Sequence, residues 1–281
     1  MLYKEMNDGR KIPMLGLGCF KAAEDECVKA VEAAISVGYR HIDTANMYEN
    51  EQYVGQGIRN SGVDRSELFV VSKIWPTSFN DPKKAVEYSM KALNIDYIDN
   101  YLLHWPGRDK DARYRAWEAL LDYQEKGYFK GVGVSNFKKE HLMDLKDKFG
   151  VDPCMNEIEL SPWNQKQEDY AYCQAHNIVM SASVPFAKGD VLKDPVLMDI
   201  AAQHGKEVGQ VVLRWNLQRG NCVIPKSSKP SRIESNFQVF DFELTQQDMD
   251  RIAELDYGKC YCSDSSVFNG GFWHIEEALL K

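Results

Sequence analysis

LFVVSKIW, residues 68–75, is the stretch that decides the fold, because an uninterrupted apolar run is followed, after one serine, by a lysine. Strands that are buried on both faces of a parallel sheet have such continuous apolar runs. Similar short runs recur along the chain, at about 15–18, 39–43, 98–103, 131–134, 154–159, 178–182 and 222–225. With the run at 68–73, they predict eight buried strands.

Helices are predicted between most of these strands. Val28, Val31 and Ile35 form one apolar stripe, and Gly38 follows as a stop signal. Asn80-Asp81-Pro82 offers a cap and a first-turn proline for a second helix. Further helices are predicted near 117–127 and in 167–176, 194–204, 209–219, 229–237 and 246–255.

Alternation of buried strands with helices predicts a parallel sheet covered by helices. Eight strands in a chain of 281 residues favour a (β/α)8 TIM barrel, preceded by an N-terminal β-hairpin that turns at Asn7-Asp8-Gly9. An open doubly wound sheet is the alternative, but residues 16–20 (GLGCF) lack its G-x-G-x-x-G turn. We expect one barrel domain over residues 1–281, with a C-terminal tail from about 257.

The composition narrows the class of partner. A net charge of −8 argues against general binding to nucleic acid or to an anionic membrane, and no apolar run is long enough to span a bilayer. Seven scattered cysteines contain no Cys-x-x-Cys pair, and six histidines contain no i, i+4 pair, so no metal site is predicted. We expect a cytoplasmic monomer that acts on a small molecule.

Four polar residues follow the predicted strands. Asp43 and Tyr48 lie in GYRHIDTANMYENE (38–51), Lys73 ends the run at 68–73, and His104 follows YLL at 101–103. The chemistry of a (β/α)8 barrel lies at the carboxyl ends of its strands, so these four side chains are expected to meet there. Singly, each has an ordinary structural explanation, and their joint placement on successive strand ends favours a catalytic set.

An acid, a phenol, an amine and an imidazole can together deliver a proton to a carbonyl oxygen. The Lys73 ammonium is expected to stabilise the Tyr48 phenolate and to lower the pKa of the phenol. Asp43 is expected to keep Lys73 charged and oriented, and His104 to donate a hydrogen bond to the substrate oxygen. Tyr48 is then the general acid of a carbonyl reduction.

The chain resembles the aldo-keto reductase family over essentially its whole length, and within it the short-loop type of bacterial and prostaglandin F synthase-like members. The resemblance is carried by MLGLGCF (14–20), GYRHIDTANMYENE (38–51), SKIWP (72–76), YLLHWP (101–106), GVGVSNF (131–137), IPKSSKPSRIESNF (224–237) and VFDFEL (239–244). It implies a (β/α)8 barrel, the tetrad named above, and reduction of aldehydes or ketones with NADPH.

The resemblance also implies where the nicotinamide is held. Ser135 and Asn136 correspond to residues that hold its carboxamide. Glu157 stands where the family commonly has glutamine, and as a carboxylate it is hypothesised to favour the oxidised cofactor. Ser183 replaces the aromatic residue that usually stacks under the ring, so about 1–3 kcal/mol of stacking is missing unless another ring such as Phe186 substitutes.

The phosphate end of the cofactor corresponds to the segment after the last strand. Lys226, Ser227 and Arg232 resemble the family's clamp on the 2′-phosphate of NADPH, and a guanidinium suits a phosphate better than a neutral ribose hydroxyl. Asn236 is expected to contact the adenine edge. Ser235 departs from the family pattern, because an acidic residue is often found at its position.

The substrate pocket is less clearly marked in the sequence. Phe20, Met47, Trp75 and Trp105 are expected to form an apolar wall beside Tyr48, although packing at the barrel rim explains them equally well. The segment after His104 is short, which predicts an open site. Three aromatic residues of the tail are further candidates to cover the pocket: Phe268, Phe272 and Trp273.

Two other functions stay open at this point. The altered nicotinamide pocket fits an alcohol-oxidising or redox-neutral enzyme. A nucleotide-sensing regulatory protein is the second alternative, although such a protein has no need of all four residues of the tetrad.

Overall fold

A closed parallel barrel forms the centre of the computed structural model, which describes residues 1–262. Within that range the barrel strands are β3 (Leu17–Gly18), β4 (His41–Asp43), β5 (Phe69–Ile74), β6 (Ile98–Leu103), β7 (Phe129–Ser135), β8 (Met155–Glu159), β9 (Val179–Ser183) and β10 (Cys222–Val223). They are hydrogen-bonded in chain order, from β3 to β10. Parallel bridges from Leu15 to Val223 and from Gly18 to Lys226 join the first strand to the last. The sheet therefore closes, and the (β/α)8 prediction is confirmed.

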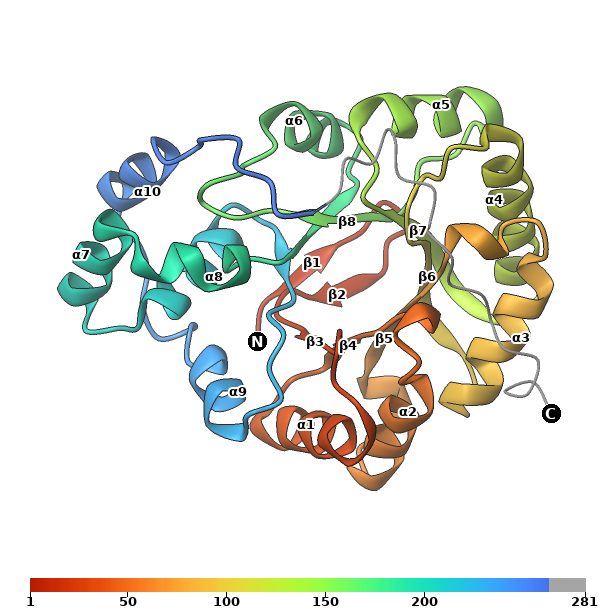
Figure 1. The fold of residues 1–281 in the computed structure, drawn as a ribbon, viewed down its shortest axis with the longest axis horizontal. Coiled ribbons are helices and arrows are strands. Elements are labelled where there is room, and N and C mark those ends of the chain that lie inside the picture. Colours follow the sequence, from red (N-terminus) through yellow and green to blue (C-terminus); the bar gives the residue numbers. More distant parts are fainter. Residues whose placement is uncertain (263–281) are drawn as a thin grey trace.

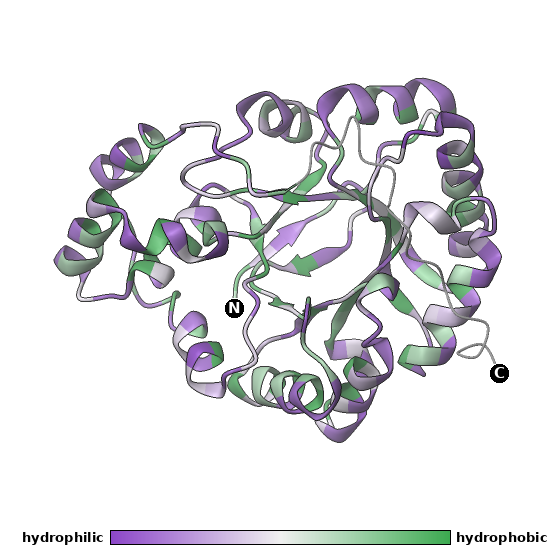
Figure 2. Cartoon of the chain, in the orientation of Figure 1, coloured by the Kyte–Doolittle hydropathy of each residue, from purple (hydrophilic) through white to green (hydrophobic). Residues whose placement is uncertain are grey.

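Helices surround the barrel on its outside (Figure 1). Their bounds are α1 (Glu24–Val37), α2 (Glu51–Asn60), α3 (Pro82–Leu93), α4 (Lys110–Glu125), α5 (Lys139–Phe149), α6 (Gln167–Ala175), α7 (Pro195–His204), α8 (Val208–Gln218), α9 (Pro230–Phe237) and α10 (Gln246–Ala253). Figure 2 shows hydrophobic residues on the strands and on the inward helix faces, and hydrophilic residues outside. Within residues 1–262 no helix is long and apolar enough to cross a membrane.

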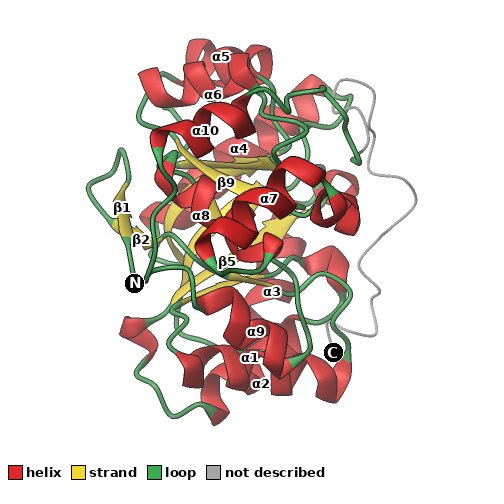
Figure 3. Cartoon of the chain, turned by 90° about the vertical axis from the view of Figure 1, so that its left-hand side faces the viewer, coloured by secondary structure: helices red, strands yellow, loops and turns green. Residues whose placement is uncertain are grey.

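An antiparallel hairpin closes one end of the barrel. It consists of β1 (Tyr3–Glu5) and β2 (Lys11–Pro13), as the sequence predicts. The Asn7 amide donates to the carbonyl oxygen of Pro153 (3.0 Å), and Arg10 donates to that of Asp99 (2.8 Å). Both acceptors lie at the amino-terminal side of the strands, and in Figure 3 the hairpin stands at that end of the molecule. The hairpin therefore does not cover the opposite end of the barrel, where the strands have their carboxyl ends and where an active site is expected.

Two helices are absent from the sequence prediction. α2 contains Gly55 and Gly57, which weaken a helical pattern. A Cβ atom on Gly55 would lie 1.9 Å from the carbonyl oxygen of Leu93 at the end of α3, so the glycine is there because the two helices meet backbone to backbone. α5 has only Leu142 and Leu145 fully buried, which leaves too short an apolar stripe to recognise.

Candidate active site

The four residues of the predicted tetrad lie together at the carboxyl ends of the strands. Asp43 is the last residue of β4, Lys73 lies near the end of β5, and His104 directly follows β6. Tyr48 ends the short 3-10 helix η1 (Asn46–Tyr48), which the chain forms just after β4. Asp43, Tyr48 and His104 line a cavity of about 720 Å³, and Lys73 is fully buried behind it.

Three oxygen atoms surround the Lys73 ammonium, and two of them accept hydrogen bonds from it. Its Nζ lies 2.6 Å from Asp43 Oδ1, 2.9 Å from the carbonyl oxygen of Thr44 and 3.2 Å from Glu157 Oε2. Burial alone would lower the pKa of Lys73, but the neighbouring acidic groups, Asp43 first, outweigh burial and raise it above its ordinary value. The amine is therefore an ammonium, which agrees with the role expected for Asp43.

Tyr48 is half-buried between the Lys73 ammonium and two rings. Lys73 Nζ lies 5.5 Å from the centre of the Tyr48 ring, and the rings of Phe20 and His104 lie 5.0 and 5.5 Å away. Burial raises the pKa of Tyr48 above its ordinary value, although Lys73 acts in the opposite direction. The expected net lowering by Lys73 is thus not found, because removal of the phenol from water outweighs the nearby positive charge. The phenol is fully protonated at neutral pH.

His104 is a neutral imidazole. Burial, and then the positive charge of Lys73, lower its pKa well below the ordinary value. The ring stands edge-on to Trp75 at 4.9 Å and to Tyr48 at 5.5 Å. A neutral imidazole has one N–H, so His104 can donate one hydrogen bond to an oxygen placed in the cavity.

Glu157 lies on β8 and joins this set, which its position in the sequence does not reveal. Its side chain is 4% exposed and contacts both Lys73 and Asp43. Burial, and then the charge of Asp43, raise its pKa well above the ordinary value. The hypothesis from the sequence is that Glu157 acts on the nicotinamide as a carboxylate. The surroundings of Glu157 disfavour this negative charge.

The residues expected around a nicotinamide lie along the same cavity. Ser135, Asn136, Glu157 and Ser183 all line it, and so does Phe186, the suggested replacement ring. The Asn136 amide donates to the carbonyl oxygen of His104 (2.9 Å) and to Ser135 Oγ (3.0 Å). These bonds fix the end of β7 beside the tetrad.

The expected phosphate clamp is only partly in contact with the cavity. Lys226 and Arg232 line it, and both are exposed. Ser227 and Asn236 do not line it. Ser227 Oγ instead accepts from the backbone N–H of Lys229 (3.2 Å), just before α9 begins. The lining thus has cations, Lys226 and Arg232 among them, and amide and hydroxyl groups near the tetrad, which fits a molecule with a phosphate and a carboxamide, as NADPH is.

The four residues expected in the substrate wall also line the cavity. Phe20, Met47, Trp75 and Trp105 lie on the side of Tyr48 and His104. Trp75 and Trp105 are nearly buried, whereas Phe20 is 45% exposed at the rim. The wall is therefore apolar, with one ring accessible at its entrance.

The chain beyond α10 returns to the cavity, which the sequence does not predict in detail. The backbone N–H groups of Tyr261 and Cys262 donate to the buried Glu159 carboxylate at 2.8 and 2.6 Å. The Tyr261 hydroxyl donates to Asp190 (2.6 Å), in the segment η4 (Ala187–Lys193). Tyr261 and Cys262 line the cavity. Phe268, Phe272 and Trp273, the further candidates for covering the pocket, lie outside the described residues.

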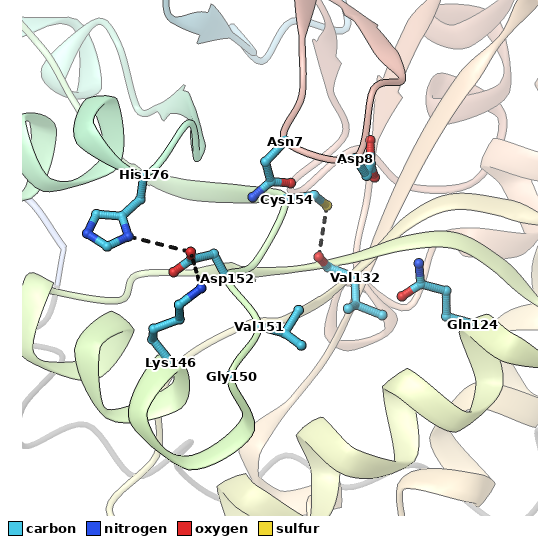
Figure 4. Close-up of a pocket in the computed structure, with 10 residues that line it drawn as sticks. All are labelled: Asn7, Asp8, Gln124, Val132, Lys146, Gly150, Val151, Asp152, Cys154 and His176. Carbon is cyan, nitrogen blue, oxygen red and sulfur yellow. Dashed lines mark hydrogen bonds and ion pairs between the residues drawn. The ribbon is translucent and has the colours of Figure 1, made fainter.

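A second pocket, of about 330 Å³, lies at the opposite end of the barrel (Figure 4). Asp152 binds Lys146 at 2.8 Å and His176 at 3.4 Å, and Cys154 donates to the carbonyl oxygen of Val132 at 2.8 Å. Asp152 thus pairs with the Lys146 and His176 side chains, and the lining of this pocket contains no tyrosine that could act as Tyr48 does.

The sequence is similar to that of known aldo/keto reductases. The model of the aldo/keto reductase family matches residues 14–257. Methylglyoxal reductase DkgA from Escherichia coli strain K12 is 41% identical over 268 residues, which cover 95% of this chain and 98% of that protein. An aldo-keto reductase from Mycolicibacterium smegmatis is 42% identical over 266 residues, with 94% and 97% covered.

Solved structures of this family are similar to the chain as well. An aldo/keto reductase from Brucella melitensis superimposes with a TM-score of 0.87 at 42% identity, covering 91% of this chain and 99% of that one. A mutant of Gox0644 in complex with NADPH superimposes with a TM-score of 0.90 at 36% identity, covering 95% and 98%. The chain belongs to the aldo/keto reductase family, and it is an oxidoreductase that acts on carbonyl compounds.

Proposed function

We propose that the protein reduces small aldehydes or ketones to alcohols with NADPH, and that Tyr48 supplies the proton. The observation that carries this proposal is that Tyr48 and His104 line one cavity, with the Lys73 ammonium behind Tyr48 and with Lys226 and Arg232 in the same lining to receive a phosphate. Bound NADPH supplies the hydride. The residues of the chain position the carbonyl group and handle the proton.

In this mechanism His104 donates a hydrogen bond to the carbonyl oxygen and orients it beside Tyr48. As negative charge develops on that oxygen, the Tyr48 hydroxyl gives up its proton. An alkoxide is a much stronger base than a phenolate, so a phenol with a raised pKa is still an adequate acid. Lys73, held charged by Asp43, stabilises the phenolate that remains.

The proposed cofactor contacts follow from the residues in and near the lining of the cavity. Arg232 and Lys226 hold the 2′-phosphate, and Ser135 and Asn136 hold the carboxamide. Glu157 and Ser183 complete the nicotinamide end. Ser227 completes the phosphate clamp, and Asn236 in α9 contacts the adenine edge, both beyond the lining of the cavity.

The apolar wall favours a small substrate with little charge. The relative from Escherichia coli is a methylglyoxal reductase, so methylglyoxal is the first substrate to test. Phe20, Met47, Trp75 and Trp105 would contact it. We further propose that the chain is a single-domain monomer that acts in the cytoplasm, and its seven cysteines, all free, are consistent with a reducing compartment.

The test is a panel of aldehydes, ketones and quinones with NADPH, followed by loss of the cofactor's absorbance. Turnover of methylglyoxal or another small carbonyl is expected. Oxidation of alcohols with no detectable reduction would favour the alcohol-oxidising alternative. Binding of NADPH without turnover of any member of the panel would contradict the proposal and favour a nucleotide sensor.

A further inference from the structure

Two carboxyl groups share one ammonium below the active-site cavity. Lys73 Nζ lies 2.6 Å from Asp43 Oδ1 and 3.2 Å from Glu157 Oε2. The exposed fraction of the side chain is 0% for Lys73, 3% for Asp43 and 4% for Glu157. A single positive charge cannot compensate two carboxylates that are removed from water, so one of the two carboxyl groups is expected to stay neutral.

The unpaired oxygens of the two carboxyl groups point to a proton held by one of them. The carboxyl groups of Asp43 and Glu157 flank the same ammonium, at 2.6 and 3.2 Å from Lys73 Nζ. Each also has a buried oxygen, Asp43 Oδ2 and Glu157 Oε2, to which no donor in residues 1–262 makes a hydrogen bond. Ionised carboxylates only accept hydrogen bonds, so these two unpaired oxygens would both lack a donor, whereas a protonated carboxyl group supplies an O–H donor of its own.

Glu157 is the member of the pair that holds the proton. Asp43 makes a short hydrogen bond with Lys73, whereas the contact of Glu157 with Lys73 is 0.6 Å longer and lacks hydrogen-bond geometry. The charged form of Asp43 is therefore better stabilised. Burial, and then the charge of Asp43, act in the same direction and raise the pKa of Glu157.

The charge of Glu157 bears on the proposed general acid through Lys73. An ammonium has three N–H groups, and Lys73 uses two of them for Asp43 Oδ1 and the carbonyl oxygen of Thr44. The third has two competing directions, toward Glu157 Oε2 at 3.2 Å and toward Tyr48, whose ring centre is 5.5 Å away. A carboxylate at Glu157 would attract this N–H more strongly than a carboxylic acid does.

We propose that Glu157 is a positioning residue that keeps a proton at neutral pH, shares it with Asp43, and so leaves one N–H of Lys73 to support Tyr48. When Glu157 loses this proton at higher pH, its carboxylate draws Lys73 away and opposes formation of the Tyr48 phenolate. The effect of Glu157 on Tyr48 rests on the proposed function, whereas the protonation state of Glu157 does not depend on it.

The groups around Glu157 allow this behaviour. The charged or titratable side chains that face it are Asp43 on β4, Lys73 on β5 and Tyr48 at the end of η1. Its neighbours on the adjoining strands, Ser135 and Ser181, carry hydroxyl groups and no charge. A neutral Glu157 has an O–H donor where glutamine has an N–H donor. The bias toward oxidised cofactor is then expected only at pH values where Glu157 ionises.

Glu159 provides a matched control on the same strand. It is also buried, and burial disfavours its charge, but hydrogen bonds from the backbone of Tyr261 and Cys262 hold its pKa below the ordinary value. Glu159 is therefore a carboxylate. It contacts the chain after α10 rather than Lys73.

The first experiment is capillary electrophoresis of the full chain near pH 7, where the formal net charge is −8. Glu159→Gln should lower the mobility by one negative charge. Glu157→Gln should leave the mobility unchanged, because it replaces a neutral acid by a neutral amide. A mobility change in Glu157→Gln equal to that of Glu159→Gln would show that Glu157 is charged and would overturn the proposal.

Asp43→Asn gives the same information if Glu157→Gln does not fold. Without the Asp43 carboxylate, Glu157 is the remaining partner for Lys73 and should release its proton. One negative charge is lost and one is gained, so the mobility of Asp43→Asn should equal that of the wild type. A loss of one charge in this variant would contradict the shared proton.

The second experiment is the pH profile of carbonyl reduction by wild type and Glu157→Gln. Since one buried charge shifts a neighbour's pKa by about one unit, the ratio of kcat in Glu157→Gln to kcat in the wild type should rise about tenfold between about pH 6 and about pH 9. Glu159→Gln should show a constant ratio. A constant ratio for Glu157→Gln would reject the action on Lys73, whereas absence of reduction in the wild type would reject the proposed function alone.

Discussion

Arg232 is the single residue on which the choice between NADPH and NADH is expected to depend. It lines the cavity at its phosphate end, and a charge-assisted pair with phosphate is worth about 1.5–3 kcal/mol. Arg232→Ala should therefore raise the Kd for NADPH roughly tenfold to a hundredfold and change the Kd for NADH little. Fluorescence titration with both cofactors measures this.

Lys229→Ala is the matched control for Arg232. Lys229 is an exposed cation immediately before the same helix, α9, but it does not line the cavity. Its substitution should leave the preference for NADPH intact. Equal losses of NADPH and NADH binding in Arg232→Ala would remove the 2′-phosphate assignment.

The sequence is sufficient to predict that Asp43, Tyr48, Lys73 and His104 lie together, but not what surrounds them. Asp43, Lys73 and His104 end consecutive strands, and strand ends of one barrel necessarily converge. The contact between Lys73 on β5 and Glu157 on β8 crosses the barrel interior. It depends on the stagger of strands that are not neighbours, which no local pattern encodes. The net rise of the Tyr48 pKa likewise depends on a degree of burial that only the packed structure supplies.

Among the helices, α2 tests how closely this fold is packed. Because a Cβ atom on Gly55 would lie 1.9 Å from the carbonyl oxygen of Leu93, Gly55→Ala must push α2 away from α3. Overpacking of this kind costs about 1–3 kcal/mol of unfolding free energy, more than the improved helix propensity returns. Urea unfolding should therefore show a lower midpoint for this variant.

Gly209→Ala in α8 is the corresponding control. The nearest atom to its added Cβ would be 3.7 Å away, in ordinary van der Waals contact. This variant should gain stability by up to about 1 kcal/mol, because alanine is the better helix former. If Gly55→Ala proved as stable as Gly209→Ala, the close approach of α2 and α3 would be wrong.

The strand pattern predicts elements such as β5 well, since a run buried on both faces is continuous in the sequence. α2 cannot be predicted from its sequence pattern in the same way, for a physical reason. Glycine at a helix crossing is selected by the neighbouring backbone of α3, not by the propensity of its own helix. The return of Tyr261 to Glu159 is similarly unpredictable, because it joins β8 to a segment about a hundred residues later.

For the whole molecule, buried ionisable groups away from the site make stability depend on pH. Glu51 in α2 accepts a hydrogen bond from Ser72 Oγ on β5 (2.5 Å), and burial raises its pKa to about 7. His41 on β4 is buried as well, and burial lowers its pKa to about 4. Over most of the acidic range the folded protein thus keeps Glu51 protonated and His41 neutral.

The two groups act on stability with opposite signs. Between about pH 4.5 and about 7 the folded state retains the Glu51 proton that the unfolded chain has lost, so stability falls as pH rises. Between about pH 4 and about 6.5 the unfolded chain holds a His41 proton that the folded state lacks, so stability rises with pH.

Glu51→Gln separates these contributions. The variant has no carboxyl to ionise, so its unfolding free energy relative to the wild type should rise by about 3 kcal/mol between about pH 4.5 and about pH 7. His41 is present in both proteins and cancels in the difference. Urea unfolding at several pH values measures this difference, and a value independent of pH would show that Glu51 does not titrate in this range.

Proton donation by Tyr48 is tested most directly by single-turnover reduction of methylglyoxal with pre-bound NADPH, in wild type and in Tyr48→Phe. Loss of a general acid typically costs 10²–10⁴-fold in rate, so the variant should be slower by about a thousandfold, with its Kd for NADPH close to that of the wild type. A variant that binds NADPH normally and reduces methylglyoxal at the wild-type rate would contradict the role of Tyr48.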